Sequence, residues 1–333
     1  GIRDSGFGIR DSGFGIRDEG VFIENFERER LDKIYNDIKN YSGMAETERY
    51  FLNGMLRYLK PRKILEAGIA QGGGTSIILN AIQDIEDAHL FSIDYATQNH
   101  FDDQTVQPGH LVEKKFSHLK DKWTRFLGGD VSKHIEKVGN EIDLMILDTA
   151  HIHPWESLNF LCVLPFLKIN NSWVILHDVS LQYLPGRDND LACRYLWESV
   201  VSDKKLQPSP DYIPHFSNIG AFKITDDTIK YIGNVFEELL NPWLALPLNF
   251  EEGNYPFGTK ILPEDLESIK NIISKYYDPD CAKFLEHVIE FQNGIAEHKN
   301  NIYKNKKLAL KDFMRRSHPK VLKILKAIKH IVK

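Results

Sequence analysis

The sequence has few cysteines and no hydrophobic run long enough to cross a membrane. Its 333 residues include three cysteines, at positions 162, 193 and 281. Their wide separation gives no metal-binding spacing, and an odd number argues against a framework of disulfide bonds. No apolar stretch reaches the ~20 residues of a membrane-spanning helix, and no secretory signal is visible. We therefore expect a cytoplasmic protein.

The signatures of several enzyme classes are also missing. The sequence has no nucleophile elbow of a hydrolase, no phosphate-binding P-loop and no zinc-binding spacing. It lacks Gly-x-Gly-x-x-Gly directly after a strand, which is the arrangement that binds a dinucleotide. An NAD-dependent Rossmann oxidoreductase therefore stays an alternative that the glycine spacing disfavours.

The stretch from Lys63 to Ser76 is the most informative one that is present. A short apolar run follows Pro61, four glycines come next, and an apolar helical pattern begins at Ile77. The order is strand, glycine loop and helix. Such a loop lets a ligand approach the backbone above the helix N-terminus, so we expect a nucleotide-like ligand there. The glycines are Gly68, Gly72, Gly73 and Gly74.

Two acids accompany this loop. Glu66 precedes the first glycine, and Asp94 ends the next apolar run, residues 89–94. The pattern Glu-x-Gly-x-x-x-Gly, from Glu66 to Gly72, resembles motif I of class I methyltransferases that use S-adenosylmethionine (SAM). The resemblance implies SAM as the cofactor, with one acid near its amino group and the other at its ribose hydroxyls. An ordinary glycine loop without a ligand is the alternative.

Strands and helices alternate from residue 61 onward. This order predicts an α/β fold with a Rossmann-like, doubly wound, mainly parallel sheet of the class I methyltransferase type, with helical additions at both ends. The predicted strands are 63–67, 89–94, 123–127, 142–147, 173–176 and one within 216–224. Ligands bind at the carboxyl ends of such strands. The polar residues expected there are Asp94, Asp130, Asp148, His177 and Asp178.

Two further stretches lie at those strand ends. One reads Asp148-Thr-Ala-His151, and the other is the pair His177-Asp178. Together with the glycine motif they resemble a methyltransferase group that includes the cephalosporin-hydroxylase-like, macrocin and rhamnosyl O-methyltransferases. The resemblance covers roughly residues 45–245.

This resemblance implies O-methylation of a sugar hydroxyl, in a cell-surface glycan or a nucleotide sugar. Alternatives are a natural-product O-methyltransferase and a non-catalytic SAM-binding scaffold at a membrane surface. Three aromatic residues are compatible with stacking on a sugar ring, namely Trp155, Tyr183 and Trp243. The residues assigned to cofactor binding are Glu66, Gly68, Gly72, Gly73, Asp94, Asp130 and Asp148.

His151 is the predicted general base. A histidine pKa near neutrality suits removal of a hydroxyl proton during attack on the methyl group. Its position, three residues after the acid that ends the fourth strand, places it above the sulfonium in the related enzymes. His153, two residues further on, is the rival, and a surface histidine without a role is the remaining alternative.

A divalent metal is a further expectation. Several members of the related group bind Mg²⁺ through carboxylates at the ends of strands four and five, which implies Asp148 and Asp178 as ligands. His177 stands where other members have glutamate. Mg²⁺ prefers hard oxygen ligands, so a histidine there suits a softer divalent ion better. The alternative for His177 is a hydrogen-bonded residue beside the cleft.

The ends of the chain differ from its middle. Residues 299–333 hold 12 Lys and Arg against one acid, although the whole chain has a net charge of −5. Within 319–333 aliphatic and lysine side chains fall on opposite sides of a helical wheel, which predicts a basic amphipathic helix. We expect it either at an anionic membrane surface, such as the inner face of the cell membrane, or on the acidic body of the protein. No nucleic-acid partner is expected.

The domain organisation follows from these patterns. The helices near the C-terminus would pack on the catalytic domain or form a surface between two copies of the chain. The predicted units are a heptapeptide-repeat tail at 1–21, N-terminal helices at 22–60, the methyltransferase domain at 61–245, C-terminal helices at 246–298, and the basic tail at 299–333.

Overall fold

The computed structural model describes residues 19–99, 105–208, 217–245 and 260–295, together with residues 298 and 305. Almost all of the heptapeptide tail and the amphipathic segment 319–333 lie outside the described residues, so both stay predictions. Among the described residues, no helix is both long and apolar enough to cross a bilayer.

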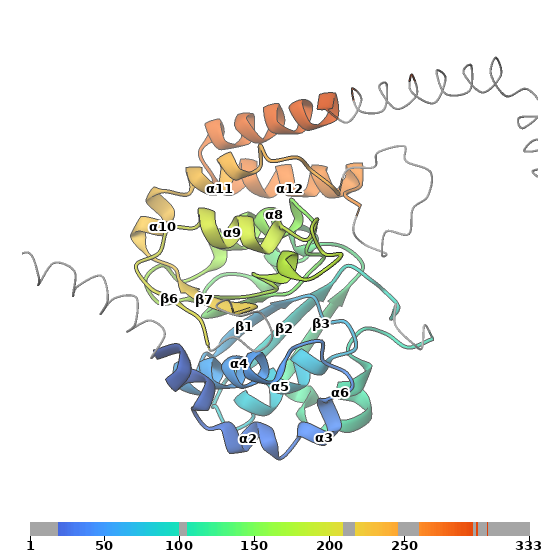
Figure 1. Cartoon of the computed structure of the whole chain (residues 1–333), viewed down its shortest axis with the longest axis vertical. Coiled ribbons are helices and arrows are strands. Elements are labelled where there is room, and N and C mark those ends of the chain that lie inside the picture. Colours follow the sequence, from blue (N-terminus) through green and yellow to red (C-terminus); the bar gives the residue numbers. More distant parts are fainter. Residues whose placement is uncertain are drawn as a thin grey trace, which may run out of the picture.

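A seven-stranded sheet in the order β3-β2-β1-β4-β5-β7-β6 forms the centre of the molecule (Figure 1). Strands β1 to β5 are parallel, whereas β7 runs antiparallel to both β5 and β6. This arrangement confirms the predicted doubly wound α/β fold. The strands are β1 (Lys63–Ala67), β2 (His89–Asp94), β3 (Trp123–Leu127), β4 (Leu144–Leu147), β5 (Trp173–His177), β6 (Lys205–Leu206) and β7 (Ile219–Lys223).

Helices cover both faces of the sheet. In Figure 1, α4, α5 and α6 lie on one face, and α8, α9, α11 and α12 lie on the other. The α-helices are α2 (Arg28–Asp32), α3 (Tyr35–Ile38), α4 (Glu46–Leu59), α5 (Gly73–Ile82), α6 (His110–Lys115), α7 (Ile135–Val138), α8 (Trp155–Val163), α9 (Ala192–Ser199), α10 (Asp226–Lys230), α11 (Gly233–Glu238) and α12 (Pro263–Tyr276). Residues 19–25 and 279–295 are also helical. The 3₁₀ turns are η1 (Ser117–Lys122), η2 (Val131–Lys133), η3 (Leu164–Phe166) and η4 (Leu181–Tyr183).

The two hydrophobic cores result from the alternation of side chains along the strands. In β1, Ile64 belongs to the core shared with α4 and α5, whereas Leu65 belongs to the core shared with α8. Successive side chains of a strand point to opposite faces, and both faces of a parallel sheet are covered by helices. A short run of apolar residues bounded by breakers is therefore buried on both sides.

The structure corrects several predicted elements. The connection after β2 contains helix α6, which the polar composition of residues 95–118 did not indicate. The apolar pattern of residues 229–245 predicts one helix, but the structure has two short helices there, α10 and α11, with a break before Gly233. Glycine lowers the stability of a helix interior, which explains the break there. Strand β6 has only two residues and was not predicted.

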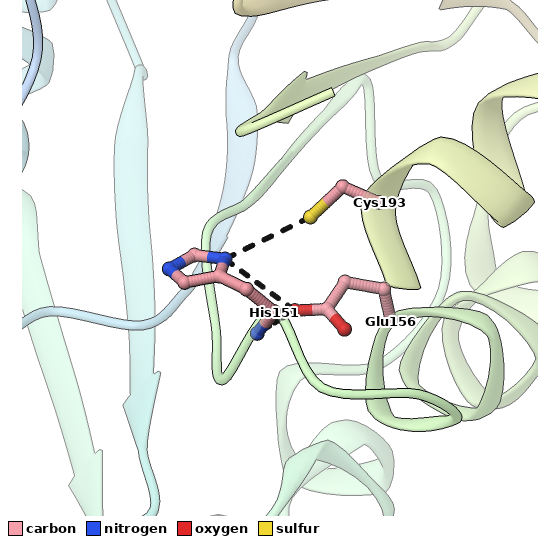
Figure 2. Close-up of side chains that lie close together, drawn as sticks. All are labelled: His151, Glu156 and Cys193. Carbon is pink, nitrogen blue, oxygen red and sulfur yellow. Dashed lines mark hydrogen bonds and ion pairs between the residues drawn. The ribbon is translucent and has the colours of Figure 1, made fainter. Parts of the chain in front are cut away.

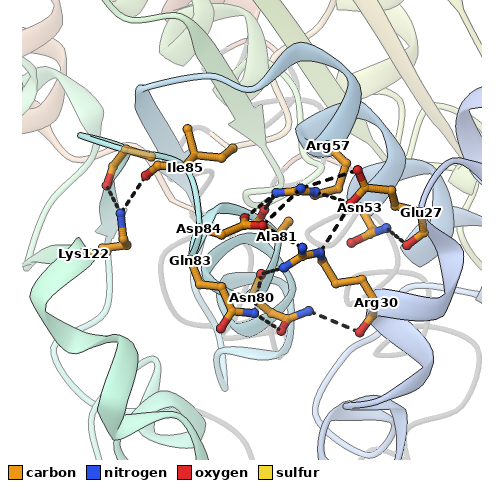
Figure 3. Close-up of polar contacts among 11 residues, drawn as sticks. Glu27, Arg30, Asn53, Arg57, Asn80, Ala81, Gln83, Asp84, Ile85 and Lys122 are labelled. Carbon is orange, nitrogen blue, oxygen red and sulfur yellow. Dashed lines mark hydrogen bonds and ion pairs between the residues drawn. The ribbon is translucent and has the colours of Figure 1, made fainter.

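Helix α4 is fixed between its neighbours by a buried arginine (Figure 3). The Arg57 guanidinium donates to Glu27 Oε2 at 2.6 Å, to Asp84 Oδ1 at 2.6 Å and to the backbone oxygen of Ala81 at 2.7 Å. Glu27 precedes α2, and Asp84 follows α5. Arg57 is buried, and a buried guanidinium is stable only when its N–H groups donate to acceptors at fixed positions around it. The far end of α4 is therefore held in place relative to α5.

Candidate active site

A cavity of about 750 Å³ opens at the carboxyl ends of β1, β2, β4 and β5. Its volume is within the usual range for sites that enclose a small ligand. It lies beside the point where the strand order reverses, between β1 and β4, as the doubly wound rule requires. The predicted site residues that line it are Glu66, Gly68, Gly73, Asp94, Asp130, Asp148, His151, His177 and Asp178.

The glycine loop brings β1 and β4 into direct contact. Gly68 has φ +94°, and a Cβ there would lie 1.8 Å from the backbone oxygen of Asp148. No side chain fits at that distance, so only glycine is accommodated. Gly72, which was assigned to the cofactor, does not line the cavity. It precedes α5 with φ +96°, and a Cβ there would lie 2.8 Å from Gly109 Cα, so its role is to shape the loop.

Glu66 is a buried carboxyl on the floor of the cavity. Its oxygens accept hydrogen bonds from Thr75 Oγ1 at 2.9 and 3.0 Å and from Ser92 Oγ at 2.6 Å. Burial raises its pKa to about 8, against the opposing effect of the two hydroxyl donors. The carboxyl is therefore mainly protonated at neutral pH in this state. Its contact with the cofactor amino group stays a prediction.

Asp94 holds the backbone of the glycine loop. Its Oδ2 accepts from the N–H groups of Ile69 at 2.8 Å and Ala70 at 3.1 Å, and its Oδ1 accepts from Ala96 N–H at 2.8 Å. Three backbone donors fix the direction of the carboxylate. Asp130 is held similarly at the end of β3, where its side chain accepts from the backbone N–H and the hydroxyl of Ser132. Burial raises the pKa of Asp130 to about 6.

A second wall, beside the glycine loop, is formed by residues that follow β4, end β5 or follow β5. His177 Nδ1 lies 3.3 Å from Asp148 Oδ1 and 3.1 Å from Asp178 Oδ2. Its Nε2 lies 3.0 Å from Glu48 Oε2, on helix α4. Burial alone would lower the pKa of His177, but the charges of Asp178 and Asp148 and their hydrogen bonds raise it well above its ordinary value. The ring thus has a carboxylate at each nitrogen.

His151 lies between Asp178 on one side of its ring and the side chains of Glu156 and Cys193 on the other, of which Figure 2 shows the second side. Its Nε2 is 3.1 Å from Asp178 Oδ2 and 3.7 Å from Asp148 Oδ1. On the other side of the ring, Nδ1 is 3.7 Å from Cys193 Sγ, while Glu156 Oε1 accepts from the backbone N–H of His151 at 2.7 Å. Both ring nitrogens and the backbone are therefore held.

The charge around His151 makes it a stronger base than a free imidazole. Burial would lower its pKa, but the charges of Asp178, Asp148 and Glu156 outweigh that effect and raise it. For Asp178 burial acts in the opposite direction, and the charges of His177 and His151 hold its pKa well below its usual range. The two imidazoles and two carboxylates form one network in which a proton has several places to reside.

The rival base and two of the aromatic residues do not share this site. His153 is buried outside the cavity lining, with Nδ1 3.5 Å from Glu238 Oε2, and burial lowers its pKa to about 3. Trp243 packs in the hydrophobic core and donates through Nε1 to the Leu239 oxygen. Tyr183 is not among the cavity-lining residues, whereas Trp155 is. Stacking on a sugar through Trp243 is therefore excluded by its burial.

Three side chains of this wall could hold a divalent cation. One potential ligand atom from each of Asp148, His177 and Asp178 lies within 4.8 Å of the others. Two carboxylate oxygens and an imidazole nitrogen suit a metal that accepts both oxygen and nitrogen ligands. Glu48 accepts from the remaining N–H of the ring, as carboxylates commonly do behind a metal-binding histidine. The residues present therefore fit such an ion.

Several members of the site carry no signal in the sequence that predicts their role. Asn218, just before β7, donates through Nδ2 to Asp178 Oδ1 at 2.7 Å. Glu48, Glu156 and Cys193 lie within helices, where no motif distinguishes them from other helical residues. The remaining missed lining residues include Tyr41, Met44, Arg187 and Asp190.

Comparison with known proteins gives one family match and several similar solved structures. Residues 65–179 match a family model described as a methyltransferase domain. No curated protein matches the chain. Three solved structures are similar over part of it. The SAH-bound methyltransferase PaMTH1 of Podospora anserina has 14% identity over 59% of this chain and 88% of that one, with a TM-score of 0.43. The SAM-bound O-methyltransferase TomG of Streptomyces achromogenes, involved in tomaymycin synthesis, has 15% identity over 63% of this chain and 97% of that one, with a TM-score of 0.42. An O-methyltransferase of Bacillus cereus in complex with SAH has 14% identity over 63% of this chain and 98% of that one, with a TM-score of 0.40.

The match begins inside β1 and ends two residues after β5, so it spans the glycine loop and the strand ends that line the cavity. The strand order places that segment in a doubly wound sheet with an antiparallel strand beyond β5. Residues 65–179 therefore match a methyltransferase domain, and they lie within a doubly wound α/β sheet.

Proposed function

We propose that this domain transfers the methyl group of SAM to a hydroxyl oxygen of a carbohydrate. One observation carries the proposal: the glycine loop and the His151–Asp178 pair line the same cavity, with His151 Nε2 3.1 Å from Asp178 Oδ2. A cofactor on the loop side and a hydroxyl on the histidine side would therefore be neighbours. Methyl transfer depends chiefly on placing the acceptor oxygen, the methyl carbon and the sulfur in line.

The residues divide the chemistry between them. SAM supplies an electrophilic methyl group, and the acceptor oxygen forms a bond to it while the carbon–sulfur bond breaks, leaving S-adenosylhomocysteine. His151 Nε2, when unprotonated, takes the hydroxyl proton. Asp178 and Asp148 then stabilise the imidazolium that results, because they raise the pKa of this ring. Glu156 keeps the ring in place through the backbone N–H of His151.

The carbohydrate acceptor is supported by the resemblance of Asp148-Thr-Ala-His151 and His177-Asp178 to sugar O-methyltransferases. The test is transfer of labelled methyl groups from SAM into a panel of glycans, nucleotide sugars and hydroxylated natural products. Label in a sugar, with release of S-adenosylhomocysteine, is the expected result. Label only in natural products would support O-methyltransferase activity and contradict a sugar as the acceptor. SAM binding without any turnover would favour a scaffold.

We also propose a divalent metal at Asp148, Asp178 and His177, where it would orient two acceptor hydroxyls and lower the pKa of the one that reacts. The donor set described above supports it. EDTA should then abolish turnover, and added Mg²⁺ or Mn²⁺ should restore it. Full turnover in EDTA would contradict the metal and leave Asp178 as the partner of the two histidines.

Reversible contact of residues 319–333 with anionic membranes is a separate proposal. Its support is the sequence pattern alone, in which each lysine near such a surface contributes about 1 kcal/mol. Flotation with anionic vesicles should be lost when the chain is ended at Ser317. Equal flotation of both chains would contradict it, and a lower melting temperature of the short chain would instead indicate docking on the body of the protein.

A further inference from the structure

Helix α4 places a carboxylate beside His177, at the carboxyl end of β5. The helix lies outside the family match, which begins at residue 65. Glu48 Oε2 is 3.0 Å from His177 Nε2, across 129 residues of sequence. Both side chains are buried. A carboxylate accepts hydrogen bonds and cannot donate them, so the imidazole N–H is the donor in this pair.

The direction of the Glu48 carboxylate is set by the start of its own helix. The same Oε2 atom accepts from the backbone N–H of Ala45 at 2.7 Å. Glu48 is the third residue of α4, and a side chain at that position commonly reaches back to the N–H that precedes the helix. The carboxylate therefore cannot turn away from His177 without leaving this N–H unpaired.

The helix itself is anchored at both ends. Arg57 fixes the far end between Glu27 and Asp84 (Figure 3). Before the near end, the chain lies directly on the glycine loop, because a Cβ at Gly73 would fall 2.2 Å from the Tyr41 backbone oxygen. The segment before α4, including Met44, also lines the cavity. Glu48 thus extends from a fixed support toward His177.

We propose that Glu48 is a positioning residue that holds the His177 ring so that Nδ1 faces Asp148 and Asp178. An imidazole anchored at Nε2 has its other nitrogen fixed on the opposite side of the ring. Asp178 contacts both His177 Nδ1 and His151 Nε2. A change in the orientation of the His177 ring would therefore alter the position of the Asp178 carboxylate beside the proposed base, His151. The role is the same whether Nδ1 carries a proton or ligates an ion, because Nε2–H donates to Glu48 in both cases.

A neighbouring glutamate of the same helix turn provides a matched control. Glu46 is exposed and pairs with Arg28 at 2.9 Å, away from the cavity lining. Glu48→Gln and Glu46→Gln each remove one carboxylate from the first turn of α4, so they share any loss of favourable interaction with the helix dipole. Differences between the two variants then report on the contact with His177.

The expected result is a loss of turnover without a matching loss of folding. In Glu48→Gln, kcat should fall about tenfold or more, the usual effect of losing such a supporting partner. Its SAM affinity and melting temperature should equal those of Glu46→Gln. The ring ¹⁵N resonances of His177, observed in the full chain by NMR, should shift in Glu48→Gln and not in Glu46→Gln. A purely structural role would not move these resonances selectively.

A double-mutant cycle tests whether Glu48 acts through His177. The variant carrying both Glu48→Gln and His177→Gln should turn over no more slowly than His177→Gln alone. Additive losses would overturn the proposal, as would unchanged ring resonances or a fall in kcat that only parallels a fall in melting temperature.

The kinetic part of this inference rests on the proposed function, but the NMR part does not. If the wild-type chain transfers no methyl group to any acceptor while the His177 resonances shift as expected, the proposed function fails and the positioning role stands. If the wild-type chain is active and the resonances do not shift, the positioning role alone fails.

Discussion

The two walls of the cavity treat their acids differently. On the wall where we propose that the cofactor binds (the cofactor wall), Glu66, Asp94 and Asp130 accept hydrogen bonds from hydroxyls and backbone N–H groups of the chain itself. On the wall where we propose that the acceptor binds (the acceptor wall), Asp178 and Asp148, the latter also assigned to the cofactor from the sequence, face the rings of His151 and His177.

Neutral donors and charged donors suit different tasks. A carboxyl held by hydroxyl and amide donors is fixed in space, so its main task is to position the groups that it contacts. Carboxylates that face imidazoles can exchange protons with them, as a base that accepts a hydroxyl proton requires. Changes on the cofactor wall should therefore alter binding or stability, whereas changes on the acceptor wall should alter turnover.

The largest effect is expected from His151→Ala. Removing a general base typically costs about 10²-fold or more in rate, so kcat should fall by about that factor while SAM affinity stays at the wild-type value. Steady-state kinetics and calorimetry with SAM measure the two quantities. His287→Ala, at an exposed histidine outside the cavity lining, is the control. Wild-type turnover in His151→Ala would end the assignment of the base.

Asp94→Ala should chiefly weaken SAM binding, whereas His151→Ala should chiefly lower turnover. The variant leaves two backbone N–H groups of the glycine loop and that of Ala96 without their acceptor, and a hydrogen bond to a charged group is worth about 1.5–3 kcal/mol. SAM should therefore bind roughly tenfold or more weakly. Glu86→Ala, at an exposed acid after α5, should bind SAM normally. Unchanged affinity in Asp94→Ala would refute the distinction between the walls.

A third expected effect is a change in how stability depends on pH. The folded-state pKa of Glu66 is raised from 4.5 to about 8. Between these values the folded chain holds a proton that the unfolded chain has lost, so this residue makes the free energy of unfolding fall as pH rises. Glu66→Gln should remove that contribution, and the difference between variant and wild type should grow from pH 4.5 to about pH 8.

Denaturant titrations at several pH values measure this difference. Glu238, whose pKa burial also raises to about 8, contributes equally to both proteins and cancels. A difference that is independent of pH would show that Glu66 is ionised in the folded protein. The cofactor wall would then resemble the acceptor wall in charge.

The central strands and the acids at their ends could be predicted from sequence because local patterns determine both. Strands β1, β2 and β3 begin and end where expected, since a buried parallel strand is a short apolar run between breakers. The carboxyl ends of parallel strands meet at one edge, which brings Asp94 and Asp148 to the same cavity. Helix α6 escaped prediction because Leu111 and Val112 are its only buried residues.

The residues that support the site could not be predicted, because their partners are remote in sequence. Glu48 contacts His177 across 129 positions, and Cys193 contacts His151 across 42. Each lies in a helix whose pattern reports only which face is buried. Which buried polar groups meet depends on how α4 and α9 pack on the sheet, and no local motif encodes that packing.

The reversed direction of β7 determines where this domain tolerates added sequence. Because β7 is antiparallel to β5, the N-terminal end of β7 lies beside the C-terminal end of β5. There, Val179 N–H donates to the Asn218 oxygen at 3.2 Å. The C-terminal end of β7 lies beside the N-terminal end of β5, where Ile224 N–H donates to the Ser172 oxygen at 3.0 Å. A reporter domain grafted after Ile224 would therefore sit at the opposite rim of the sheet, whereas one grafted at Asn218 would enter the reaction centre.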